Sequence, residues 1–204
     1  MHYQRTLHAV SRRSCDAVVL YVEHTAVYDA KAAIRWLRKH ASELRVDPDR
    51  IAAFGCSAGA MTTAFLCGVG DTKGEGNSGN PGYSSDIQAG VALSGALIEL
   101  NYFNVQLNED LKPYLDFHGC NDHTVPYYCP KGRPSKQTLE CWGSGVDTVE
   151  HMNTKKPGIA HLYSFSGAGH CPHGDVDKGP AMDTMLGFLS EHLDLAHAEC
   201  PRPL

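Results

Sequence analysis

Several patterns that would identify a class of protein at once are absent from this sequence. No apolar run approaches the roughly 18 residues that a membrane-spanning helix needs. No cluster of Lys and Arg stands out as a nucleic-acid-binding surface would require, and the 18 basic residues are outnumbered by 23 acidic ones, for a formal net charge of −5. The sequence therefore predicts neither a membrane span nor a nucleic-acid partner.

The cysteines also lack a familiar pattern. There are eight of them, but no C-x-x-C pair occurs, which argues against zinc ribbons and thioredoxin-like chemistry. We predict no cofactor and no metal. Residues 1–16 carry charges with no apolar segment after them, so they do not form a secretory signal. Disulfides in an oxidising compartment and buried free thiols both account for the cysteine number. We favour an exported protein whose signal is not in this chain.

Strand-like and helix-like segments alternate along the chain. Short apolar runs predict strands, and apolar residues at three- and four-residue spacing predict helices. The predicted strands are Ala17–Glu23, Arg50–Phe54, one within Ile87–Leu97, Tyr114–Phe117 and Ala160–Phe165. The predicted helices are Asp29–Leu44, Ala60–Cys67, Val146–Thr154 and Pro180–Ala196. This alternation predicts an α/β fold with a doubly wound, mostly parallel sheet covered by helices on both faces.

The length and the 42% hydrophobic content suffice for one core. We expect residues 17–197 to form a single domain. Residues 1–16 form an N-terminal segment of undetermined structure, and residues 198–204 form a C-terminal tail.

The pentapeptide Gly55–Gly59 reads Gly-Cys-Ser-Ala-Gly and lies between a predicted strand and a predicted helix. A serine on such a tight turn presents its hydroxyl at the edge of the sheet, and the flanking glycines let strand and helix approach closely. The backbone amide of Ala58, at the helix N-terminus, is placed to stabilise an oxyanion. Ser57 is therefore the candidate nucleophile, with a small-residue turn of no chemical role as the alternative.

Two later strands each end close to a residue that could activate this serine. Asp122 follows the strand Tyr114–Phe117 by a short loop, and His170 follows Ala160–Phe165 by a glycine loop. The carboxyl ends of parallel strands meet at one edge of a sheet. We therefore expect Ser57, His170 and Asp122 to converge as nucleophile, base and acid.

These motifs, in the order Ser, Asp, His, resemble the esterase branch of the α/β-hydrolase superfamily over about residues 17–195. They are the Ser57 pentapeptide, H-G-x-x-D-x-x-V-P around Asp122 and G-x-G-H at His170. The stretch Glu75–Leu97 resembles a loop and strand of bacterial carboxylesterases close to acetyl-xylan and feruloyl esterase-like enzymes. The resemblance implies an acyl-enzyme mechanism in which the serine attacks a small-molecule or carbohydrate ester, the histidine transfers the proton and the aspartate orients the histidine.

Two features of the family's pattern are not found here. The family carries a second oxyanion donor in an H-G-G-G-like loop, and no such motif precedes Ser57. The family also has several strands before the one at Ala17–Glu23, so we expect a fold that lacks its first strands. Ala58 is then the identified donor, and loss of one donor costs roughly 10²–10³ in rate.

Two other functions fit the same sequence. A truncated or catalytically silent hydrolase-like protein with a binding role would explain the missing motif. The same triad would also serve a peptidase or a thioesterase. Labelling with a fluorophosphonate and a panel of acyl substrates would separate these functions.

Other polar residues are expected to have more ordinary roles. His118 is expected to end its strand or to pack beneath the site. Asp147 and Asp175 are backup candidates for the acid. Ser94 ends a strand but lacks the second glycine of a nucleophile turn.

Two groups of residues could bind a metal ion, but we favour ordinary loops without a metal at both places. A zinc site could combine Cys120, Asp122, Cys171 and His173. A calcium site could combine Asp71, Glu75, Asn77 and Asn80.

If the cysteines form disulfides, their positions offer two candidate pairs. Cys129 and Cys141 bracket a loop rich in proline and glycine and are the favoured pair, and the nearby Trp142 is a candidate for lining a substrate pocket. A Cys120–Cys171 disulfide would join the loops of the acid and the base. Sequence alone cannot assign the connectivity.

Overall fold

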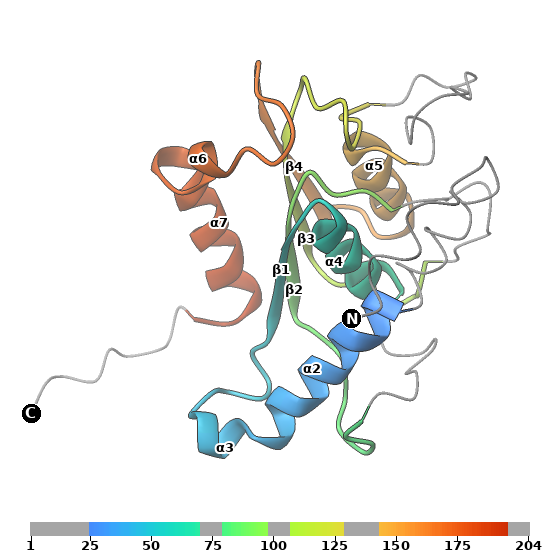
Figure 1. Ribbon diagram of the computed structural model, residues 1–204, viewed down its shortest axis with the longest axis vertical. Coiled ribbons are helices and arrows are strands. Elements are labelled where there is room, and N and C mark those ends of the chain that lie inside the picture. The colour runs from blue at the N-terminus through green and yellow to red at the C-terminus, as the bar shows by residue number, and fades with distance from the viewer. Residues whose placement is uncertain (1–24, 70–78, 98–106, 129–142, 196–204) are drawn as a thin grey trace, which may run out of the picture.

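The computed structural model of this chain describes residues 25–69, 79–97, 107–128 and 143–195 (Figure 1). Within these ranges, four parallel strands form one sheet in the order β1-β2-β3-β4. The strands are β1 (Ala52–Cys56), β2 (Ala89–Leu93), β3 (Tyr114–Gly119) and β4 (Ala160–Phe165). The helices are α2 (Val27–Lys39), α3 (Ala41–Leu44), α4 (Ala58–Val69), α5 (Gly145–Lys155), α6 (His173–Val176) and α7 (Gly179–His192).

Helices cover both faces of the sheet. Figure 1 shows α4 and α5 on one side and α6 and α7 on the other. The first face packs against apolar residues of α2, α4 and α5, and the second against residues of α6 and α7 such as Val176 and Phe188. The predicted α/β architecture with a parallel sheet between two helical layers is confirmed.

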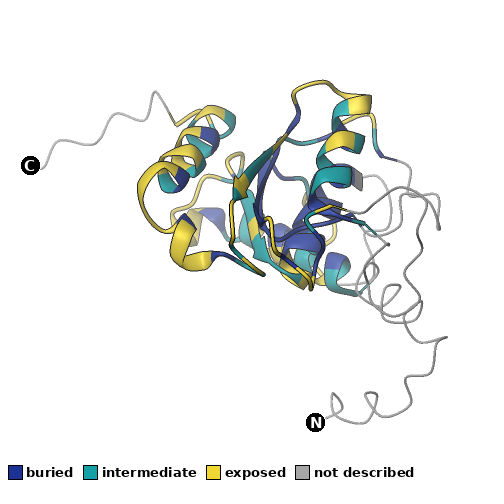
Figure 2. Ribbon diagram, turned by 90° about the horizontal axis from the view of Figure 1, so that it is seen from above, coloured by how far each residue is buried: buried dark blue, intermediate teal, exposed yellow. Residues whose placement is uncertain are grey.

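The two central strands are buried at every residue, as Figure 2 shows in dark blue. Both faces of β2 and β3 are covered, so these strands have no solvent side and carry no apolar–polar alternation. β3 also buries a carboxyl group and an imidazole, those of Asp116 and His118. Such groups need partners inside the protein, and these partners belong to the site described below.

Most predicted elements are present with shifted ends. Strand β1 runs two residues further than predicted, so Cys56 is its last residue, and β3 extends to Gly119. Strand β4 has the predicted bounds, and α4 begins two residues before the predicted Ala60. The four-residue helix α6 was not predicted. The predicted strand Ala17–Glu23 and both predicted terminal segments lie outside the described residues. Of the expected domain 17–197, the structure describes residues 25–195 with three gaps.

The predicted helix Asp29–Leu44 is divided in two at His40. The His40 ring nitrogen Nδ1 lies 2.8 Å from the Trp36 carbonyl, which also accepts the His40 backbone N–H at 3.1 Å. The side chain thus competes with the backbone for one acceptor, and the His40 dihedral angles depart from helical values. The spacing of apolar residues, which predicted one continuous helix, does not reveal this interaction of the His40 side chain.

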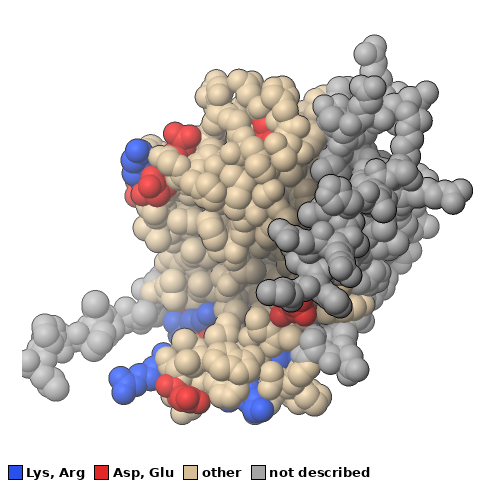
Figure 3. Space-filling model, viewed as in Figure 1, with Lys and Arg blue, Asp and Glu red and all other residues tan. Residues whose placement is uncertain are grey.

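The charged side chains of the described residues lie in small groups of both signs on the face shown in Figure 3. Lys112 forms ion pairs with Asp86 and Asp110 at 2.7 and 2.6 Å. Among the described helices, none has the length and apolar character that crossing a bilayer requires.

Helix α4 lies so close to β2 that the strand has room only for a glycine at position 90. A Cβ on Gly90 would overlap the Cys67 sulfur and would lie 2.8 Å from the Thr63 methyl group. Gly187, in the middle of α7, is the opposite case, because a Cβ there meets no heavy atom within 4 Å.

We expect the substitution Gly90→Ala to lower the free energy of unfolding by about 1–3 kcal/mol, because the added methyl forces α4 away from the sheet. The matched control Gly187→Ala should raise it by about 0.5–1 kcal/mol through helix propensity. Urea denaturation measures both. An unfolding free energy unchanged by Gly90→Ala would contradict the close packing.

Candidate active site

Ser57 lies half-buried on the turn between β1 and α4, with a backbone φ of 56°. A non-glycine residue in the left-handed region costs about 1–3 kcal/mol, and such residues cluster at functional sites. Hydrogen bonds hold the turn from both sides. The Ser57 N–H donates to the Leu93 carbonyl, and the Ser57 carbonyl accepts from the Met61 N–H, each at 3.0 Å.

Only one of the two glycines around Ser57 is required for the close approach of β1 and α4. A Cβ on Gly55 would overlap the Gly59 carbonyl and would lie 2.8 Å from the Ala60 nitrogen. A Cβ on Gly59 would meet no heavy atom within 4 Å. The prediction that both glycines serve this approach is therefore wrong for Gly59, whose Cβ position faces open space.

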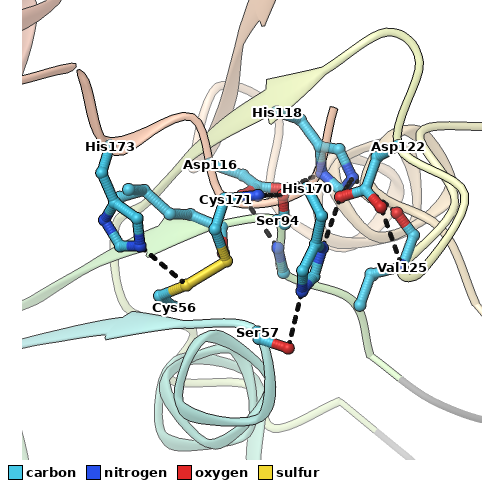
Figure 4. The surroundings of a disulfide bond; sticks show 12 residues. Cys56, Ser57, Ser94, Asp116, His118, Asp122, Val125, His170, Cys171 and His173 are labelled. Carbon is cyan, nitrogen blue, oxygen red and sulfur yellow. Dashed lines mark hydrogen bonds and ion pairs between the residues drawn. A yellow bond between two sulfur atoms is a disulfide. The ribbon is translucent and has the colours of Figure 1, made fainter. Parts of the chain in front are cut away.

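The three residues predicted to converge do so in the structure (Figure 4). The His170 Nε2 atom lies 2.8 Å from the Ser57 hydroxyl oxygen, and His170 Nδ1 lies 2.8 Å from Asp122 Oδ2. A carboxylate only accepts hydrogen bonds, so Nδ1 carries the ring proton and donates it. In the neutral ring, Nε2 is then the acceptor that faces the Ser57 hydroxyl.

Asp122 is a buried carboxylate surrounded by donors. Its Oδ1 atom accepts the backbone N–H groups of Thr124 at 2.8 Å and Val125 at 3.0 Å. Burial by itself would raise the pKa of Asp122, but hydrogen bonds from Ser94, His170 and these two backbone groups lower the pKa below its ordinary value. Asp122 is therefore ionised at neutral pH.

The loops after β3 and β4 pack directly on each other. The Asn121 N–H donates to the Ala168 carbonyl at 2.9 Å, and the Cys120 N–H donates to the Phe165 carbonyl at 3.0 Å. A Cβ on Gly119 would overlap the Ala168 carbonyl, so the contact needs a glycine there. This packing sets the separation between the loop of Asp122 and the loop of His170.

Ser94 lacks the glycine pattern of a nucleophile turn, but it is part of this hydrogen-bonded network. It directly follows β2, its φ is 57°, and its side chain is hydrogen-bonded to Asp122. Its hydroxyl oxygen also accepts the Cys171 N–H at 2.9 Å. A serine at the carboxyl end of a strand next to Ser57's strand is the signal that could have identified it.

A second histidine–carboxylate pair lies beneath the first. His118 Nδ1 is 2.8 Å from Asp116 Oδ2, and both side chains are fully buried in β3. His118 Nε2 lies 2.9 Å from the Val125 carbonyl and 3.5 Å from Asp122 Oδ2. A carbonyl only accepts, so Nε2 carries a proton. As predicted, His118 packs beneath the site, where it supports the loop that carries Asp122.

The pKa values of both partners in the Asp116–His118 pair are raised. Burial by itself would lower the pKa of His118, but the hydrogen bond and the charge of Asp116, with smaller contributions from Val125 and Asp122, raise it. Burial raises the pKa of Asp116, against the hydrogen bonds from His118 and the Gly95 N–H. Each step of the pair's titration is thereby moved to higher pH.

The cysteine connectivity differs from the one suggested by the sequence. Cys171 forms a disulfide with Cys56, 115 residues away, and not with Cys120, which is a free, exposed thiol. The loop after β4 runs back across the edge of the sheet towards β1. On this path the Cys171 N–H donates to the Ser94 hydroxyl oxygen at the end of β2. The pairing thus follows the path of this loop, which spacing along the chain does not show.

The free-thiol interpretation holds for Cys67, which is buried in the core, where burial raises the pKa of its thiol. The favoured pair Cys129–Cys141 and the pocket residue Trp142 lie outside the described residues.

Ala58, the predicted oxyanion donor, is the exposed first residue of α4. The first N–H groups of a helix have no acceptor within the helix, so they are open to an external ligand. Ala58 directly follows Ser57 and therefore lies at the same edge of the sheet.

Comparison with known proteins supports the esterase resemblance. The BD-FAE family model matches residues 22–104. An arylesterase of Saccharolobus solfataricus is 43% identical over 68 residues, a match that covers 28% of this chain and only 22% of the arylesterase.

Solved structures match over more of the chain. A truncated form of a carbohydrate esterase from gut microbiota superposes with a TM-score of 0.62 and 21% identity, covering 82% of this chain and 68% of the other. The apo form of esterase 2 of Thermogutta terrifontis gives a TM-score of 0.58 and 28% identity, covering 88% and 68%. The chain therefore has the α/β-hydrolase fold and is similar to esterases of that fold.

Within this α/β-hydrolase, the alternative acids take no part in the contact with His170. Asp147 instead accepts the Ser144 hydroxyl at 2.7 Å at the start of α5, and Asp175 lies exposed in α6.

The suggested zinc set is not brought together. In the described part of the chain, the group of three close metal-ligating side chains is Cys56, Cys171 and His173, of which the cysteines are joined in the disulfide. Three residues of the suggested calcium set lie outside the described ranges, and the fourth, Asn80, accepts a hydrogen bond from Lys39.

The raised pKa of His118 predicts a pH dependence of stability. Because the folded-state pKa lies above the unfolded value of about 6.5, the stabilisation is complete below that pH and is lost as pH rises through the folded value. The substitution Asp116→Asn retains the shape of the side chain and can retain its hydrogen bonds with His118 and the Gly95 N–H. It removes the negative charge that raises the pKa of His118.

We therefore expect the melting-temperature advantage of the wild type over Asp116→Asn to shrink as pH rises from about 6.5. Thermal unfolding of both proteins in one buffer series measures this. A difference that stays constant with pH would show that Asp116 does not raise the pKa of His118.

Proposed function

We propose that this α/β-hydrolase cleaves carboxylic esters, with Ser57 as nucleophile, His170 as general base and acid, and Asp122 as the partner of His170. The observation that carries the proposal is the continuous chain of two 2.8 Å contacts from the Ser57 hydroxyl through His170 to Asp122. Similarity to an arylesterase and to a structurally characterised esterase favours an ester over other acyl compounds.

The geometry supports a two-step reaction. Ser57 Oγ attacks the ester carbonyl while its proton moves to His170 Nε2, and the imidazolium then protonates the departing alcohol. Water next gives a proton to His170 and attacks the acyl-enzyme, after which Ser57 recovers its proton and the acid leaves. The ionised Asp122, already bonded to His170 Nδ1, orients the ring and stabilises the imidazolium.

The carbonyl oxygen that becomes negative during each attack would be stabilised by the Ala58 N–H. This group is at the positive end of α4, where the helix dipole adds to the hydrogen bond. No second donor is assigned to the described residues.

Two connections support a constant distance between nucleophile and base. The Cys56–Cys171 disulfide joins the residue before Ser57 to the residue after His170. The Cys171 N–H also donates to Ser94, which contacts Asp122. Holding reacting groups in place in this way lowers the entropic part of the barrier.

We propose a small acyl ester as substrate, with simple aryl esters and acetylated carbohydrates as the first classes to assay. Ser57→Ala should lower kcat for p-nitrophenyl acetate by roughly 10⁴–10⁶-fold, because a methyl group cannot form the acyl-enzyme. Ser190→Ala, a serine in α7, is the matched control and should retain wild-type turnover.

A fluorophosphonate probe distinguishes this proposal from a catalytically silent protein. Labelling should occur in the wild type and in Ser190→Ala, and should be lost in Ser57→Ala. Turnover that persists in Ser57→Ala would refute the nucleophile assignment, and absence of both turnover and labelling in the wild type would favour a binding role. Faster turnover of thioesters or peptides than of esters would overturn the substrate class.

A further inference from the structure

Two sulfur atoms and one imidazole nitrogen meet beside the candidate active site (Figure 4). Cys56 ends β1, Cys171 lies in the loop after β4, and His173 is the first residue of α6. His173 Nε2 is 3.4 Å from Cys56 Sγ, and the ligand atoms of all three residues lie within 4.8 Å of one another. The mechanism proposed above uses none of these side chains.

The disulfide blocks metal binding at this place, because the thiolate and not the disulfide is the metal ligand. Reduction changes the chemistry of the group completely. It leaves two thiols beside an imidazole, and two cysteines with one histidine form a donor set typical of zinc.

The distances suit such a site. In a tetrahedral zinc site with the usual bond lengths, a sulfur and a nitrogen ligand are about 3.6 Å apart. The observed separation of 3.4 Å between Cys56 Sγ and His173 Nε2 is already close to this value. The two cysteine Cα atoms are 6.2 Å apart, so rotation of a side chain can separate the sulfurs to the required distance of about 3.8 Å.

The backbone of each ligand is held by contacts other than the disulfide. Cys56 is paired with Leu93 in the sheet, and the Cys171 N–H donates to Ser94 at 2.9 Å. The His173 N–H donates to the Cys171 carbonyl at 2.7 Å. The backbone at these three residues is therefore held in place when the sulfur–sulfur bond is broken.

The site is open to a reductant and to an ion. Both cysteines are half-buried and His173 is exposed. Water can complete the coordination of an ion bound there, as in zinc sites with three protein ligands.

We propose that, once the Cys56–Cys171 disulfide is reduced, Cys56, Cys171 and His173 bind one zinc ion, which replaces the disulfide as the tether between β1 and the loop of His170. Binding creates a new cross-link between segments 115 residues apart and therefore stabilises the reduced fold. The proposal concerns metal binding and does not depend on ester hydrolysis.

The chemistry balances with a phosphine as reductant. The phosphine supplies two electrons that break the sulfur–sulfur bond, takes an oxygen atom from water to become a phosphine oxide, and leaves two protons on the thiols. Zinc binding then releases these two protons, because the metal ligand is the thiolate.

The test measures bound zinc by equilibrium dialysis and elemental analysis, with melting temperature as a second readout. The reduced wild type should bind one more zinc ion per chain than the reduced double variant Cys56→Ser/Cys171→Ser. His173→Ala should weaken this binding at least tenfold, whereas His161→Ala, which removes another exposed histidine, should not. Zinc should raise the melting temperature of the reduced wild type and leave that of the oxidised protein unchanged.

The double variant accounts for zinc bound by the other cysteines and histidines, and Ser57→Ala can replace the wild type to separate binding from catalysis. Equal zinc content in the reduced wild type and the double variant would overturn the proposal. So would wild-type affinity in His173→Ala, equal binding by the oxidised protein, or a reduced chain that stays unfolded by circular dichroism with zinc present.

Discussion

The buried negative charge of Asp122 is the constraint around which the carboxyl edge of the sheet is organised. A buried carboxylate is stable only when donors surround it. Here they come from separate parts of the fold, namely its own loop through Thr124 and Val125, the end of β2 through Ser94, and the loop after β4 through His170. The same interactions that stabilise the charge also bring together the loops that carry the candidate site.

Two histidine–carboxylate pairs lie one beneath the other near this edge, and they differ in solvent exposure and therefore in role. The His118 side chain is fully buried and both of its ring nitrogens have protein partners, which suits a structural pair. The His170 side chain is 26% exposed and directs its second nitrogen at the Ser57 hydroxyl. Only the second pair leaves a nitrogen facing a group that can react.

Three non-glycine residues in the left-handed region cluster at the same edge, Ser57, Ser94 and Cys171, with φ of 56°, 57° and 51°. Each conformation is supported by a backbone N–H that donates to a neighbouring segment: Ser57 to Leu93, Ser94 to Phe117, and Cys171 to the Ser94 hydroxyl. Strained conformations persist when surrounding contacts over-determine them. The disulfide at Cys171 adds a covalent link to this arrangement.

The sequence by itself determined the alternation of strands and helices and the convergence of Ser57, Asp122 and His170, because local hydrophobic patterns define strands and parallel strands end at one edge. It did not indicate the contact of Ser94 with Asp122, the pairing of His118 with Asp116 or the Cys56–Cys171 connection. These depend on strand order and on the path of the loop after β4 across that edge. Such contacts join segments far apart in the chain, so only the tertiary structure decided them.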